Sequence, residues 1–171
     1  MTLKIKTHVS VWRIATDTPA YDAVDMTGKG AELSGGRWNR AGTPLIYAAS
    51  SAALACLETI VHIGSGALPL NRYLVRIDVP ISAWNAAHLA TPDLLVGWDA
   101  LPPGLVSLDW GTSWANSLQT LIARVPSIVV PEEENLLINP RHPEAFRLSV
   151  HKLRKWTYDT RLLPTGPGAA T

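Results

Sequence analysis

GGRWNRAGTPLIYAASSAALACLETIVH, residues 35–62, is the stretch around which this chain is organised. Its Gly35-Gly36 pair permits a tight turn or the close approach of a ligand. The apolar run Leu45–Ala48 follows a turn signal and predicts a short buried strand. Ser51 then offers an N-cap hydroxyl to a helix predicted over Ala52–Ile63.

The predicted helix is apolar apart from a few residues, and Glu58 is the only charged one among them. A carboxylate in so apolar a helix costs free energy unless a partner stabilises it. His62 lies one turn later on the same face, so it is a partner within reach. Two interpretations follow. Glu58 either pairs with His62 or faces solvent, or it supports positive charge in a cleft of low dielectric constant.

Other polar side chains are candidates for the same cleft. Arg37 follows the double glycine, and a guanidinium binds phosphate or carboxylate through parallel hydrogen bonds, although an arginine packed on Trp38 is equally common. Tyr47, inside a buried strand, is typical of a core. Arg13 is either a second anion-binding group or the partner of an acidic residue in a salt bridge. Ser127 lacks the surroundings of a hydrolase nucleophile, so we interpret it as a hydrogen-bonding group.

The composition is typical of one globular domain with a well-filled core. The 171 residues are 47% hydrophobic and only 17% charged, so we expect an apolar surface or one covered by a partner, a second copy included. A net charge of +1 gives no support to a nucleic-acid or membrane footprint. The single cysteine and the lack of a long apolar run predict a cytoplasmic protein without an intrachain disulfide. We expect a domain over residues 1–163 and a flexible tail over 164–171.

The order of the remaining elements shows no regular β-α-β alternation. It predicts an α+β fold with a split or strongly bent sheet flanked by helices. Strands are predicted over Ile5–Ala15, Arg72–Val79, Ser127–Val130, Leu136–Ile138 and Arg147–Trp156. Helical spacing predicts a helix over Trp110–Arg124, a partly helical connection over 82–103, and a loop over Thr16–Ser34 with one helical turn near Tyr21.

Two long blocks of the chain resemble the RES domain. They are residues 35–62 and VPSIVVPEEENLLINPRHP at 125–143, and the likeness extends back to VWRIA at 11–15. The family is named for an arginine, a glutamate and a serine, which here correspond to Arg37, Glu58 and Ser127. The resemblance implies a RES domain over residues 1–163 with a fold similar to that of ADP-ribosyltransferases. It further implies an NAD⁺ cleft lined by Arg13, Arg37, Tyr47, Glu58 and Ser127, with His62 and Asn139 as weaker candidates.

Members of this family are toxins of type II toxin–antitoxin pairs that consume NAD⁺. We expect phosphorolysis or hydrolysis, with ADP-ribose transfer to a cellular protein as the alternative. Cleavage of the nicotinamide–ribose bond develops an oxocarbenium-like cation, which Glu58 would stabilise. The resemblance assigns the pyrophosphate to Arg37 and Arg13, the nicotinamide ring to Tyr47, and a hydrogen bond to nicotinamide or an attacking phosphate to Ser127. It implies no metal and an Xre-type antitoxin that covers the cleft.

One departure from related enzymes narrows the expected reaction. Arginine-directed ADP-ribosyltransferases typically resemble a Glu-x-Glu pattern, and Cys56 stands where the first glutamate would be. This disfavours arginine modification and leaves phosphate, water or another side chain as acceptor. Two other classes stay open. A non-catalytic module would use the apolar, tryptophan-rich surface for partner contact, and a metal hydrolase would need ligands beyond Glu58 and His62 that the spacing does not offer.

Overall fold

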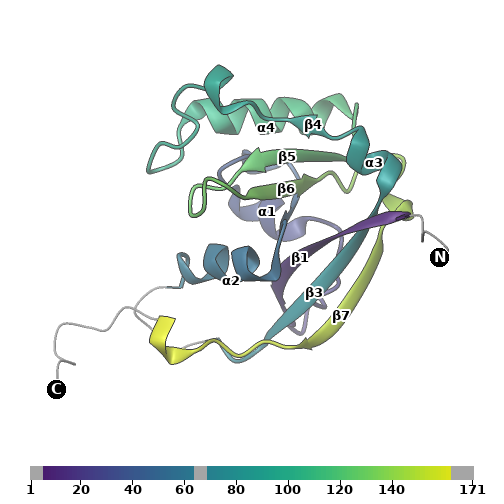
Figure 1. The fold of residues 1–171 in the computed structure, drawn as a ribbon, viewed down its shortest axis with the longest axis vertical. Helices are drawn as coiled ribbons and strands as arrows, with labels where there is room; N and C mark the ends of the chain where they lie inside the picture. Colours follow the sequence, from purple (N-terminus) through teal and green to yellow (C-terminus); the bar gives the residue numbers. More distant parts are fainter. Residues whose placement is uncertain (1–5, 64–68, 163–171) are drawn as a thin grey trace, which may run out of the picture.

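The structure, a computed structural model, describes residues 6–63 and 69–162, and it consists of a seven-stranded sheet with helices packed around it (Figure 1). The strands are β1 (His8–Thr16), β2 (Ile46–Ala49), β3 (Arg72–Pro80), β4 (His88–Leu89), β5 (Ile122–Pro126), β6 (Glu134–Ile138) and β7 (Ser149–Lys155). The α-helices are α1 (Lys29–Ser34), α2 (Ala52–Ile60), α3 (Ile81–Asn85) and α4 (Leu105–Ser117). Short 3-10 turns occur at Pro92–Leu94, Ala145–Arg147 and Thr160–Leu162.

The sheet is mixed and divides into two parts. Its strand order is β4-β5-β6-β2-β1-β3-β7, and neighbouring strands are antiparallel except for β4 and β5. β1 pairs with β3 along its whole length, but it meets β2 only where Trp12 lies opposite Ala49. Figure 1 shows the second part, β1, β3 and β7, running obliquely to β5 and β6. The predicted α+β fold is therefore confirmed, and the split falls between β1 and β2.

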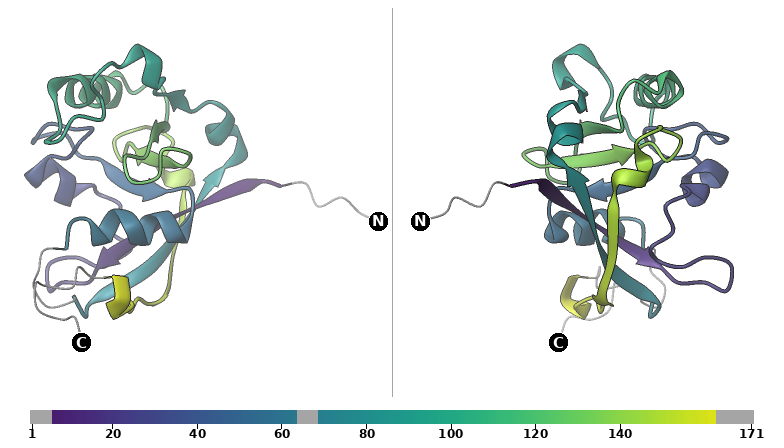
Figure 2. Two further views of the ribbon diagram at one scale, coloured as in Figure 1. Left: turned by 60° about the vertical axis from the view of Figure 1, so that its left-hand side comes forward. Right: turned by 90° about the vertical axis from the view of Figure 1, so that its right-hand side faces the viewer.

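Helix α2 crosses the sheet near this split. It begins at Ser51, whose hydroxyl accepts a hydrogen bond from the Leu54 N–H at 3.0 Å, as expected of an N-cap. Leu54 and Ala55 are buried against Ala49, so the apolar side of the helix faces β2 and β1. Figure 2 shows α2 lying in front of the strands of the second part. This packing fixes the height and rotation of Glu58 above the sheet.

Helix α4 holds the turn that contains the double glycine. A Cβ atom at Gly111 would clash with the carbonyl oxygen of Trp38, so only glycine lets the two backbones approach this closely. Trp38 is buried in a core cluster with Trp114 of α4 and Leu137 of β6. The turn at residues 36–39 is thus clamped between α4 and the sheet.

Most predicted strands have counterparts in the structure, and Arg72–Val79 is confirmed as β3. The predicted helix Ala52–Ile63 is confirmed as α2, which ends at Ile60. The predicted strand Ser127–Val130 is wrong. Pro126 ends β5, and the Ser127 hydroxyl then accepts hydrogen bonds from the next N–H groups and closes a turn.

The predicted helix Trp110–Arg124 is displaced, because α4 spans Leu105–Ser117 and Ile122 begins a strand. Leu118 ends α4 in the left-handed region, with φ of 53°. Glycine or asparagine usually occupies such a position, so a leucine gives no indication in the sequence that the helix ends there. The helical turn expected near Tyr21 is also wrong, since α1 begins at Lys29. The expected tail at 164–171 and the start of the first predicted strand lie outside the described residues.

No helix in the described ranges, 6–63 and 69–162, is long and apolar enough to cross a membrane.

Candidate active site

Glu58 is held by two side chains from the other part of the sheet. Its Oε1 accepts a hydrogen bond of 2.7 Å from the Ser127 hydroxyl and a short one from the side-chain amide of Asn135. Both bonds go to the same oxygen. Within the part of the chain that the structure describes, Oε2 has no hydrogen-bond partner. Glu58 is therefore fixed in orientation while one carboxylate oxygen stays available to a ligand.

The hydrogen-bonding capacity of Ser127 is fully used. Its hydroxyl donates to Glu58 and accepts from the N–H groups of Val129 and Val130, both at 3.1 Å. A hydroxyl has one proton and two acceptor positions, so the two accepted bonds direct its proton to the carboxylate. Ser127 lies at 0% exposure. We therefore interpret it as a residue that positions Glu58, instead of the direct ligand of nicotinamide or phosphate that the resemblance implied.

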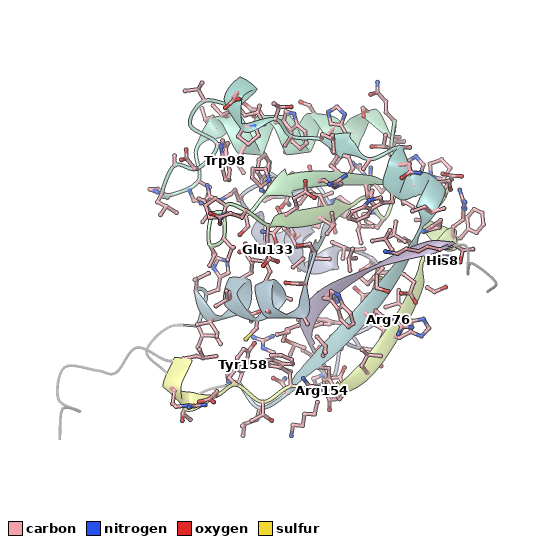
Figure 3. All side chains as sticks on the ribbon, in the orientation of Figure 1. His8, Arg76, Trp98, Glu133, Arg154 and Tyr158 are labelled. Atoms are coloured by element: carbon pink, nitrogen blue, oxygen red, sulfur yellow. The ribbon has the colours of Figure 1, made fainter. Side chains whose placement is uncertain are left out.

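The hairpin turn between β5 and β6 also holds the start of α2. Glu133 accepts hydrogen bonds from the hydroxyls of Ser50, at 3.2 Å, and Ser51, at 2.7 Å. A carboxylate at a helix N-terminus is favourable because it faces the positive end of the helix dipole. Figure 3 shows Glu133 on one side of α2 and Tyr158 on the other. The hairpin thus fixes both the helix and the carboxylate that the helix carries.

Arg37 lies near Glu58 and ties down a distant segment. Its Nη1 donates to the carbonyl oxygens of Trp98 and Ala100, both at 2.9 Å. Burial lowers the pKa of Arg37, and the negative charges of Glu58 and Asp99 oppose this shift. The guanidinium stays charged, because the ordinary pKa of arginine lies far above neutral pH. Its Nε and Nη2 atoms make no hydrogen bond to the described residues, so they can take an anionic ligand.

Tyr47 is anchored through its hydroxyl. The hydroxyl donates to Asn39 Oδ1 at 2.7 Å and accepts from the Trp38 N–H at 3.1 Å. Burial raises the pKa of Tyr47, so the group is a neutral hydroxyl that can donate this bond. A Cβ atom at Gly36 would lie 2.7 Å from the same hydroxyl, which explains the glycine beside Arg37. The double-glycine turn and the strand thus place Tyr47 and Arg37 in fixed positions.

A cleft of about 270 Å³ opens where β1 and β2 part, and its wall includes Arg13, Ile14, Tyr47 and Arg72. Glu58 is not part of this wall. Tyr47 belongs to the wall, and its hydroxyl accepts from the N–H of Trp38, the residue after Arg37, so the cleft lies beside the turn that carries Arg37. A larger hollow of about 420 Å³, behind the double glycine, is lined by none of the predicted site residues. We therefore take the cleft with Glu58 as the candidate site.

The structure does not bring all the predicted residues together. Arg13 is oriented like Val11 and Ala15, which belong to the core cluster on the face opposite α2, and its Nη2 donates to the Ala23 carbonyl at 3.0 Å. Burial lowers the pKa of Arg13. It reaches the cleft wall from that face without contacting Glu58.

Asn139 and His62, the weaker candidates, also lie apart from Glu58. Asn139 is buried, with its amide bonded to the Ala115 carbonyl and its Oδ1 to the Arg141 N–H, so it joins β6 to α4. His62 follows the end of α2 and is exposed; its ring makes no hydrogen bond to the described residues. Neither contact pattern supports a role in ligand binding.

Sequence reasoning missed Asn135 and Asn39. Asn39 is at 0% exposure and donates to the carbonyls of Ala31, Arg40 and Thr43, so it organises the turn that anchors Tyr47. Asn135 directly precedes the apolar run of β6 and lies opposite Ala49 at the end of β2. A single asparagine beside a strand carries no sequence signal, so only the strand register reveals its contact with Glu58.

We predict that Asn135→Ala lowers kcat for nicotinamide release from NAD⁺, the substrate that the resemblance implies, about tenfold, because it removes one hydrogen bond to a carboxylate. KM should change little, since Asn135 contacts the carboxylate and lies outside the cleft wall. Steady-state rates of nicotinamide release measure both values. Asn85→Ala, at the exposed end of α3, is the matched control. A wild-type kcat in Asn135→Ala would show that Ser127 alone positions Glu58.

No group of three or more histidine, cysteine or acidic side chains that could hold a metal ion occurs among residues 6–63 and 69–162.

Comparison with known proteins gives consistent matches over most of the chain. The profile of a family described as RES domain matches residues 10–161. A Sphingobium protein named Prs ADP-ribosylating toxin is 57% identical over 155 residues, which cover 90% of this chain and 96% of that protein. A Yersinia enterocolitica protein named Toxin Res is 40% identical over 83% of this chain and 93% of its own. A Pseudomonas putida protein of the same name is 36% identical over 89% and 98%.

Proposed function

Since this chain belongs to the RES domain family, we propose that it is a toxin that cleaves the nicotinamide–ribose bond of NAD⁺ and transfers ADP-ribose to a protein in the cytoplasm. The observation that carries this proposal is the carboxylate of Glu58, with one oxygen fixed by Ser127 and Asn135 and the other available. The name of the relative at 57% identity favours protein transfer over the phosphorolysis or hydrolysis that we expected from the sequence.

The proposed reaction needs a group that stabilises positive charge on the ribose. The bond between the anomeric carbon and the nicotinamide nitrogen breaks, and its electron pair leaves with neutral nicotinamide. The ribose then resembles an oxocarbenium ion until a nucleophile of the target bonds to the anomeric carbon and releases its proton. The free oxygen of Glu58 would stabilise this cation and hold a ribose hydroxyl. Because Ser127 and Asn135 orient it beforehand, little reorganisation is needed during the reaction.

The other residues support binding of the same substrate. Arg37 has Nε and Nη2 available for the pyrophosphate, which carries the charge that a guanidinium binds best. The hydroxyl of Tyr47 already donates to Asn39, so we propose that the aromatic ring of Tyr47 contacts the substrate. The ring would stack on nicotinamide, which is cationic in NAD⁺. Arg13 also lies in the cleft wall and makes one hydrogen bond, to the Ala23 carbonyl, so its positive charge would add to the attraction for the pyrophosphate.

Product analysis tests the proposal. Purified protein is incubated with NAD⁺ labelled in the adenylate part, with phosphate or without it, and with cell lysate or with purified Prs, the target named for the Sphingobium relative. We expect nicotinamide release together with label on a protein. Free ADP-ribose as the sole product would establish hydrolysis, and its phosphorylated form would establish phosphorolysis. Absence of nicotinamide release under every condition would refute NAD⁺ cleavage.

We also propose that an Xre-type antitoxin covers this site. Large apolar side chains are exposed close to the segment that Arg37 holds, namely Val96 at 83% and Leu101 at 78%. Burial of such side chains by a partner is favourable. We expect addition of saturating antitoxin to suppress nicotinamide release. Unchanged turnover in the saturated complex would refute coverage of the cleft, and light scattering of the toxin alone would show whether it forms the homodimer that we expected.

A further inference from the structure

Arg72 lies in the wall of the cleft without a partner. It is the first residue of β3 and pairs with Thr16, the last residue of β1, so it stands at the edge where the two parts of the sheet separate. Its guanidinium makes no hydrogen bond or ion pair with any residue in 6–63 and 69–162, and its Nε is buried without an acceptor. A partly buried cation in this state is costly unless a ligand compensates its charge.

The other cations of the cleft are already engaged. Arg13 donates to the Ala23 carbonyl and lies within the influence of the negative charge of Asp25, and Lys29 forms an ion pair of 2.6 Å with Glu32. Asp25 is the carboxylate among the described residues of the cleft wall, and it also accepts hydrogen bonds from Thr27. Among these described residues, Arg72 is thus the cation without a counter-charge.

The groups near Arg72 within the described residues do not supply an anion either. Tyr158 is buried close to it, and burial raises the pKa of this tyrosine although the charge of Arg72 opposes the shift. Cys56 lies near the same tyrosine, and burial raises the pKa of its thiol as well. Both groups are neutral near pH 7. Among residues 6–63 and 69–162, Arg72 therefore has no anionic partner, and a bound molecule can supply the counter-charge.

We infer that Arg72 binds the pyrophosphate of the dinucleotide in the cleft. This inference rests on the proposed function, which supplies the ligand. The guanidinium presents paired donors that match phosphate oxygens. Tyr47 and Arg72 line the cleft of about 270 Å³, whereas Arg37 and Glu58 lie outside its wall. A dinucleotide held by both Arg72 and Arg37 would therefore occupy the cleft and extend past Tyr47 toward Glu58. Arg72 would be the second cation on the pyrophosphate and a residue that sets affinity.

The test is binding of ADP-ribose, which contains the pyrophosphate but requires no bond cleavage. We expect Arg72→Gln to weaken ADP-ribose binding at least tenfold by calorimetry and to raise KM for NAD⁺ by the same factor, with kcat within threefold of wild type. Arg72→Lys should be intermediate, because it keeps the charge and loses the paired donors. Arg76→Gln is the matched control, since Arg76 lies on the same strand and is paired with Asp78.

Several outcomes separate this inference from the proposed function. If Arg72→Gln is folded and binds ADP-ribose as wild type does, the inference is wrong even though NAD⁺ is cleaved. If wild type binds ADP-ribose through Arg72 but releases no nicotinamide from NAD⁺, the proposed function is wrong and the inference stands. A lowered melting temperature in Arg72→Gln with unchanged ADP-ribose affinity would show a structural role and overturn the inference. If Arg72→Gln does not fold, Arg72→Lys decides by the same affinity measurement.

Discussion

Glu58→Gln should lower the rate of nicotinamide release about 10²–10³-fold, the loss typical of removing a group that stabilises charge in the transition state. The substitution keeps the shape of the side chain and an amide oxygen that can still accept from Ser127 and Asn135. It removes the negative charge that we propose stabilises the ribose cation. The melting temperature should therefore stay near that of wild type, and cells expressing the variant should grow normally.

The matched control for this variant is Glu132→Gln. Glu132 lies in the neighbouring hairpin turn, is exposed, and makes no hydrogen bond to the described residues. Loss of its charge should leave the rate of nicotinamide release and the toxicity unchanged. A Glu58→Gln protein that kept both wild-type turnover and wild-type toxicity would remove Glu58 from the proposed chemistry.

Gly111→Ala should destabilise the protein by about 3 kcal/mol or more, the upper end of the cost of overpacking. The added Cβ would clash with the Trp38 carbonyl oxygen, and this neighbour is backbone that cannot rotate away. For a domain of this size the loss corresponds to a fall in melting temperature of about 6–12 °C. Thermal unfolding followed by circular dichroism measures it. Any folded fraction should also be less active, because Trp38 anchors Tyr47.

Gly30→Ala tests whether that effect comes from the close contact or from the loss of a glycine. Gly30 lies in α1, and a Cβ atom there would have no neighbour within 4 Å. Alanine in a helix is more favourable than glycine, so this variant should be more stable by about 0.5–1 kcal/mol. Equal destabilisation by both substitutions would contradict the assigned contact between α4 and the turn.

The sequence predicted elements whose signals are local. The cap of α2 follows from Ser51, and the alternation of Arg72–Val79 is that of β3. The predictions were wrong where the spacing of apolar residues fitted both a helix and a strand. Leu121 and Ile122 have helical spacing after Trp114, but they also fit a buried strand, and no glycine or proline marks the end of α4 at Leu118. Tertiary packing decided the outcome at these positions.

The candidate site was predictable only in part. The resemblance grouped Glu58 with Ser127, and the structure shows them in contact. Asn135 and Arg72 could not be found in this way, because their positions depend on strand register and on the separation of β1 from β2. Arg13 is of a residue type that binds anions, yet the alternation of side chains along β1 places it on the face of the sheet opposite α2, away from Glu58. Such contacts are set by long-range pairing, which local composition does not encode.

The bonds from Arg37 to the Trp98 and Ala100 carbonyls have a thermodynamic consequence. A bound phosphate that moved the guanidinium would weaken these two hydrogen bonds. The observed conformation of residues 98–100 would then be less stable. Linkage between two binding sites is reciprocal. A protein that bound this segment and changed its position would alter the affinity of the chain for the dinucleotide by some factor, and the dinucleotide would alter the affinity of the chain for that protein by the same factor. Inhibitor strength measured without the substrate would then differ from that measured at cellular NAD⁺ concentration.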